Sequence, residues 1–158
     1  MMSQTLSTAS EALQTNEPRV ARTASWERLV ILYVRIAFGY ASLSPVADRF
    51  GLWDKYTGWG NFANFTRYVA QVNSFMPALT IPFLAWAATA AETTLGILLI
   101  LGIWPCWVAL GSAILLFLFG TAMAISFGIK TPLDYSVFSA SAGALLLSLQ
   151  ARKSAVNA

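Results

Sequence analysis

The chain has no histidine, a single cysteine and few charged residues. Zinc, haem and iron–sulfur sites are built mainly from histidine and cysteine. We therefore expect that the side chains of this protein bind no metal ion and build no cofactor site. Cys106 has no second cysteine with which to form an intrachain disulfide or a CxxC redox pair. Lysine and arginine form no basic stripe, which argues against a nucleic-acid partner. No nucleophile–base pair or phosphate-binding loop indicates a stand-alone enzyme.

The scarcity of charge is matched by an excess of apolar residues. Charged residues make up 11% of the chain and hydrophobic residues 57%, with a mean hydropathy of +0.61. Soluble domains carry roughly 25% charged residues. A soluble domain of 158 residues has too small a core to hide this much apolar surface, so we predict that the lipid bilayer is its solvent.

Four apolar runs predict four membrane-spanning helices. Each is close to the ~20 residues that cross the hydrocarbon core. The fourth is the least apolar, because it contains four serines, which can face neighbouring helices rather than lipid. The predicted fold is an all-α integral membrane four-helix bundle with spans at about 29–47, 81–103, 105–128 and 133–150.

The ends of the chain are polar. We predict a disordered tail over residues 1–24, a transmembrane domain over residues 25–151 and a C-terminal tail over residues 152–158. Thr131, Pro132 and Asp134 resemble a helix start, with a threonine cap, proline at the first position and an acid in the first turn. Basic residues beside the first and last runs favour a cytoplasmic location for both termini.

A long aromatic segment separates the first two runs. Phe62, Phe65, Val69 and Val72 recur at helical spacing, which predicts a short amphipathic helix at the membrane surface; an ordered loop is the alternative. Aromatic side chains favour the membrane interface, and we assign that position to Trp53, Trp59, Phe62 and Phe65.

Two charges lie deep within the predicted spans, Arg35 in the first and Glu92 in the second. Ionisable groups at the membrane centre cost roughly 2.5–3.5 kcal/mol each, so they usually face the bundle interior and find a partner. The estimated depths of Arg35 and Glu92 differ by roughly 7–8 Å, a gap that a guanidinium can largely span. We therefore predict a direct or bridged link between them. It is either a structural ion pair or a ligand- or proton-binding site.

A second polar group is expected at the outer end of the bundle. It comprises Asp48, Arg49 and Asp134, and its simplest interpretation is a solvated rim. Trp53 and Trp59 beside it could stack on a quinone, although interfacial anchoring is the simpler explanation.

The chain resembles the DoxX-like membrane proteins over residues 29–150. The resemblance rests on Arg35 and Gly39 in the first run, and on Glu92 and Gly96 followed by the apolar stretch 97–102 in the second. It implies a bacterial four-helix bundle associated with redox complexes, one of them a thiosulfate:quinone oxidoreductase. Family members often carry a lysine near the end of the first helix, where this chain has Arg49 after a proline.

Three function classes remain open from the sequence. The resemblance favours an accessory membrane subunit of a redox complex, with quinone as a candidate cofactor and a membrane redox protein or a second copy as partner. The alternatives are a small proton- or solute-coupled transporter and a membrane assembly scaffold. The expected location is the bacterial inner membrane.

Overall fold

The computed structural model describes the backbone of residues 2–53 and 58–156, and the side chains of residues 25–53 and 58–155. Within these ranges it contains α-helices and one short 3-10 helix, and no strand, as predicted. The chain forms two compact units, Met1–Val34 and Arg35–Ala158. The second unit contains the helical bundle and all the sites described below.

Three helical segments of the described chain are long and apolar enough to cross a membrane: Ser25–Arg49, Ala78–Leu101 and Pro105–Phe127. They agree with the first three predicted spans. Their windows are only 11%, 28% and 33% buried, which leaves most of this apolar surface for lipid. The protein is therefore an integral membrane protein.

The first span is part of a longer helix, α1 (Met2–Arg49). The backbone of residues 2–24 is helical, where the composition predicted a disordered tail, and the domain boundary near residue 24 stays a prediction. No interruption of the helix occurs at Pro45, which lies within α1. The helix continues to Arg49, which is part of the candidate functional site described below.

The second and third spans are α3 (Ile81–Leu101) and α4 (Pro105–Phe127). Gly102 ends α3 in the left-handed conformation, with φ 73°, and its N–H bonds to the carbonyls of Leu98 and Leu99. Pro105 begins α4 at its first turn, where a missing N–H has no cost. The short turn makes α3 and α4 antiparallel neighbours.

The predicted amphipathic helix is confirmed as α2 (Phe62–Val72). Asn61 caps its N-terminus by accepting the N–H of Asn64. Phe65, Val69 and Val72 are buried, and α2 packs against both α3 and α4. The 3-10 helix η1 (Ala78–Thr80) joins α2 to α3.

The fourth predicted span has a different start from the one expected. A short helix, α5 (Lys130–Asp134), precedes α6 (Val137–Val156), and Ser136 separates them with φ 55°. Thr131 is inside α5 rather than its cap, because α5 already begins at Lys130. The helix α6 is 20 residues long but does not meet the apolarity that marks α3 and α4, so a fourth span stays a prediction.

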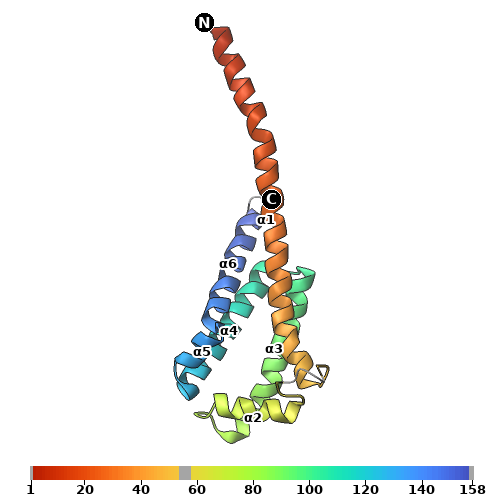
Figure 1. Ribbon diagram of the computed structural model, residues 1–158, viewed down its shortest axis with the longest axis vertical. Helices are drawn as coiled ribbons and strands as arrows, with labels where there is room; N and C mark the ends of the chain where they lie inside the picture. The colour runs from red at the N-terminus through yellow and green to blue at the C-terminus, as the bar shows by residue number, and fades with distance from the viewer. Residues whose placement is uncertain (1, 54–57, 157–158) are drawn as a thin grey trace. The chain divides into compact units, whose positions relative to one another are not determined.

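Small residues let the helices of the second unit approach closely. In Figure 1 residues 35–49 of α1 run alongside α3 and α6, while α2 and α5 lie near one end of the bundle. A Cβ on Gly39 of α1 would lie 3.0 Å from the Gly96 carbonyl of α3, and a Cβ on Gly143 of α6 would lie 3.1 Å from the Phe38 ring. Helices α4 and α6 pack together most extensively. Ser141 donates to the Ala113 carbonyl across that contact.

Candidate functional site

The centre of the site is a buried ion pair between the end of α1 and the middle of α3. Nη2 of Arg49 pairs with Oε2 of Glu92, and the two residues are 3% and 9% exposed. Nη1 of Arg49 donates to the Thr89 hydroxyl at 2.8 Å. That hydroxyl in turn donates to the Ala85 carbonyl at 2.8 Å, which fixes its orientation. Thr89 and Glu92 are three residues apart, so they share one face of α3.

Aromatic rings complete the environment of the Arg49 guanidinium. Its carbon lies 3.7 Å from the centre of the Phe65 ring and 5.5 Å from that of Trp59. Trp59 and Phe65 contact each other edge to face at 5.1 Å. A desolvated cation over an aromatic face is stabilised by about 2 kcal/mol. Helix α2 therefore closes the site by placing Phe65 over the cation.

Arg35 does not pair with Glu92, which corrects the direct link expected from the sequence. Its Nε donates to the Leu99 carbonyl at 3.0 Å and its Nη2 donates to the Ile100 carbonyl at 3.1 Å. These carbonyls belong to the last turn of α3, where backbone acceptors lack partners within the helix. Arg35 caps the C-terminus of α3, and Arg49 takes the place beside Glu92.

The direction of side chains in antiparallel helices explains this exchange. Each Cα–Cβ bond tilts toward the N-terminus of its own helix. Helices α1 and α3 approach each other closely at Gly39 and Gly96. Arg35 precedes this crossing and leans further away from Glu92, whereas Arg49 follows it and leans back toward Glu92. Glu92 itself leans toward the end of the bundle at which α1 terminates, and so meets Arg49.

A cavity of about 510 Å³ lies beside the ion pair, between α2, α3 and α4. Arg49 and Glu92 are the charged residues in its wall, and Tyr68 and Asn73 add polar groups from α2 and the residue that follows it. The remaining wall is apolar and aromatic, formed by Pro45, Trp59, Phe65, Val69, Val72, Leu84, Ala87, Ala88, Ala91, Leu115, Leu118, Phe119, Ala122 and Met123. An apolar chamber with a few convergent polar groups is typical of a site for a lipophilic ligand.

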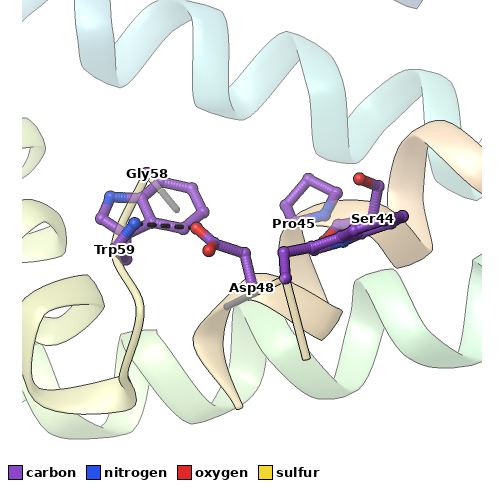
Figure 2. A pocket seen from close by; sticks show the side chains of 6 residues that line it. Ser44, Pro45, Asp48, Gly58 and Trp59 are labelled. Atoms are coloured by element: carbon purple, nitrogen blue, oxygen red, sulfur yellow. Dashed lines mark hydrogen bonds between the residues drawn. The ribbon is translucent and has the colours of Figure 1, made fainter. Parts of the chain in front are cut away.

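A second pocket, of about 430 Å³, lies beside Asp48 (Figure 2). Ser44, Pro45, Trp53, Gly58 and Trp59 form the rest of its lining. Oδ2 of Asp48 accepts the backbone N–H of Trp59 at 2.8 Å, which ties the loop before α2 to the end of α1. Pro45 and Trp59 line both cavities.

The polar group expected at the outer end is only partly brought together. Asp48 and Arg49 are both buried, at 8% and 3% exposure, rather than forming a solvated rim. Asp134 is exposed and pairs with Lys130 within α5, and it lines neither cavity. Asp134 does not join Asp48 and Arg49. It ends the short helix α5, which the break at Ser136 separates from α6.

The predicted interfacial aromatics divide into two sets. Trp53 is 46% exposed and its Nε1 donates to the Ser44 carbonyl at 3.2 Å. Phe62 packs on Trp86 of α3, with ring centres 4.2 Å apart. Phe65 is buried at 4% exposure, and with Trp59 it contacts Arg49 instead of forming an outer surface.

Comparison with known proteins identifies the family. Residues 50–134, more than half of the 158-residue chain, match the family model described as "Methylamine utilisation protein MauE". The chain belongs to the MauE family. No curated protein matches it, and no solved structure does.

The MauE match covers α2, α3, α4 and α5, and therefore includes Glu92, Thr89 and Phe65. Arg49 is the residue immediately before the matched segment. The resemblance to DoxX-like proteins stays a resemblance to another family of small membrane proteins.

Proposed function

We propose that this MauE-family chain is an accessory membrane subunit of a redox system, and that its α2–α3–α4 cavity binds a quinone or quinol. The observation that carries the proposal is the position of the Arg49–Glu92 pair in the wall of an otherwise apolar chamber. The family description connects the proposed system with methylamine utilisation.

The polar part of the cavity lining supports a ligand with a carbonyl head. The paired charges of Arg49 and Glu92 line the cavity together with Tyr68 and Asn73, whose side chains can donate to an oxygen. The apolar wall suits a quinone ring and the start of its hydrophobic tail.

Glu92 supports a role in proton handling at the same place. Carboxylates buried within a membrane bundle commonly mark proton or ligand sites. Conversion of a quinone to a quinol takes up two electrons and two protons; the electrons would come from a partner redox protein. Arg49 would orient the ligand oxygen, and Glu92 would accept or deliver a proton beside it.

The remaining parts of the proposal concern location and partners. We place the chain in the bacterial inner membrane with both termini in the cytoplasm, because Arg28, Arg152 and Lys153 flank the first and last apolar helices. The partner is a membrane-associated redox protein or a second copy of the chain.

Quinone content tests the proposal directly. The protein is purified in mild detergent, its lipid extract is assayed for quinone by mass spectrometry, and co-purifying proteins are identified. We expect near-stoichiometric quinone in the wild type, at least a tenfold loss in Arg49→Met and no loss in Asp134→Asn. Asp134→Asn is the matched control, because it alters an exposed carboxylate outside both cavities.

Two outcomes would overturn this function. One is wild-type protein without quinone or a redox partner; the other is quinone content unaffected by Arg49→Met. Solute or proton flux in proteoliposomes that Glu92→Gln abolishes would instead support the transporter alternative.

A further inference from the structure

The cavity beside the ion pair reaches the surface of the bundle at the seam between α3 and α4. On the α2 side its wall is closed by Phe65, Val69 and Val72, which are buried. The exposed residues of the lining are Ala87 on α3 and Leu118 on α4, and Leu118 is 57% exposed. The cavity therefore opens between Ala87 and Leu118.

Helices α3 and α4 are in tight contact near the turn that joins them and enclose space further along. A Cβ on Gly111 of α4 would lie 3.1 Å from the Leu95 side chain of α3, so the two helices leave no gap there. One helical turn further from the loop, Ala91 of α3 and Leu115 of α4 already line the cavity. The seam is thus closed at the turn and hollow beyond it.

The opening lies at the depth of the lipid acyl chains. Ala87 is one turn from Ala91, the midpoint of α3, and Leu118 is two residues from Leu116, the midpoint of α4. At 1.5 Å per residue, Ala87 and Leu118 lie about 6 Å and about 3 Å from the middle of their helices. With each span centred in the bilayer, the hydrocarbon core extends about 15 Å to either side of that middle. The cavity therefore opens to acyl chains rather than to water.

The cavity and its opening accommodate different parts of a ligand. Glu92 follows Ala87 by about 7–8 Å along the axis of α3. A ring that contacts the Arg49–Glu92 pair occupies the closed end, and a chain attached to it points toward Ala87 and Leu118. The cavity volume of about 510 Å³ is in the range of roughly 300–1,000 Å³ that encloses a drug-sized molecule, whereas a polyisoprenoid chain is much longer. Such a chain has to leave the protein through the opening.

We propose that the opening between Ala87 and Leu118 is a lateral entrance, through which the ligand comes from the bilayer and in which its chain stays when the ring is bound. The identity of the ring rests on the proposed function, whereas the entrance itself is independent of it. A quinone dissolved in the bilayer reaches the cavity without crossing water. The site therefore takes lipid-soluble, long-chain quinones in preference to quinones without a side chain.

Photolabelling in proteoliposomes tests the entrance in the absence of quinone. The full chain is reconstituted in phosphatidylcholine, a fraction of which carries a diazirine halfway along one acyl chain, and the adducts are mapped by mass spectrometry. We expect adducts on Met123, a buried residue of the cavity wall that lipid outside the protein does not contact. Ala87→Trp should reduce them at least fivefold by filling the entrance. Ala90→Trp is the matched control and should leave them unchanged, because Ala90 is an exposed alanine of α3 outside the lining.

A second pair of variants approaches the entrance from α4. Leu118→Trp narrows it and should also reduce the adducts on Met123, whereas Phe117→Trp, at an exposed position outside the lining, should not. A long-chain ubiquinone added to the wild-type vesicles should displace the acyl chain and suppress the adducts. The same concentration of a ubiquinone without a side chain should suppress them several-fold less.

The outcomes distinguish the entrance from the proposed function. Absence of adducts on Met123 in the wild type, or equal adducts in the wild type and in both Ala87→Trp and Leu118→Trp, would overturn the entrance even if the purified protein contains quinone. Adducts that both variants reduce but long-chain ubiquinone does not suppress would support the entrance and overturn quinone as its occupant. Equal suppression by the two ubiquinones would overturn the preference for a long chain.

Discussion

The partner of Glu92 can be tested by a double-mutant cycle. In the structure Glu92 pairs with Arg49, and removing one member of a buried pair costs about 3–5 kcal/mol because a charge is left uncompensated. We expect Arg49→Met to lower the free energy of unfolding by an amount in this range. Glu92→Met should lower it by less than Arg49→Met but still within the range, because Arg49 keeps its contacts with the Thr89 hydroxyl and the Phe65 ring.

The double variant should be far milder than the sum of the single ones. Replacing a whole buried ion pair by apolar residues is often neutral or stabilising. If each single variant costs at least about 3 kcal/mol and the double variant is near neutral, the coupling free energy between Arg49 and Glu92 should be about 6 kcal/mol or more. The measurement is reversible unfolding of each variant in mixed micelles, followed by circular dichroism as the fraction of denaturing detergent rises.

A second double-mutant cycle, which combines Arg35→Met with Glu92→Met, serves as the control. Arg35 binds carbonyls seven and eight residues beyond Glu92 in α3, which places the two groups about 11 Å apart along the helix. Sites this far apart add within about 0.5 kcal/mol. Strong coupling between Arg35 and Glu92, with additivity between Arg49 and Glu92, would refute the assignment.

Three further predictions concern the bundle that holds the site. Arg35→Met should lower the free energy of unfolding by about 2 kcal/mol, since it removes charged hydrogen bonds to the last turn of α3, and a change in quinone content would contradict its capping role. Gly96→Val should cost about 1–3 kcal/mol, because a Cβ there would meet the Gly39 carbonyl at 3.1 Å; unchanged stability in the same micelle assay would rule out this crossing. Ser141→Ala should cost about 0.6 kcal/mol through loss of the bond to Ala113, and a larger loss would show that more than this bond is broken.

The sequence predicted the helices well, because their signals are local. Apolar length defined three spans, and the spacing of Phe65, Val69 and Val72 defined the buried face of α2. The start of the last helix was missed, because the break at Ser136 depends on a left-handed backbone conformation that proline and capping patterns do not indicate.

The site was only half predictable. Glu92 and Arg35 are conspicuous charges in apolar runs, so composition alone draws attention to both. Their separation depends on where α1 and α3 cross, which is a tertiary property of Gly39 and Gly96. The sequence does carry a signal for the correct partner: side chains lean toward the N-terminus of their own helix, which disfavours Arg35 as the partner of Glu92 and favours Arg49.

The dependence of α6 on α4 has a consequence for how the chain is made. Helix α6 is less apolar than the spans before it, and its serines bond across to carbonyls of α4, Ser141 to Ala113 and Ser148 to Cys106. These hydroxyls find their acceptors only after α4 has formed. Synthesis from the N-terminus supplies α4 first, so α6 can pack against a helix that is already present when it leaves the ribosome. A chain truncated after α4 would leave the face of α4 that packs against α6 uncovered.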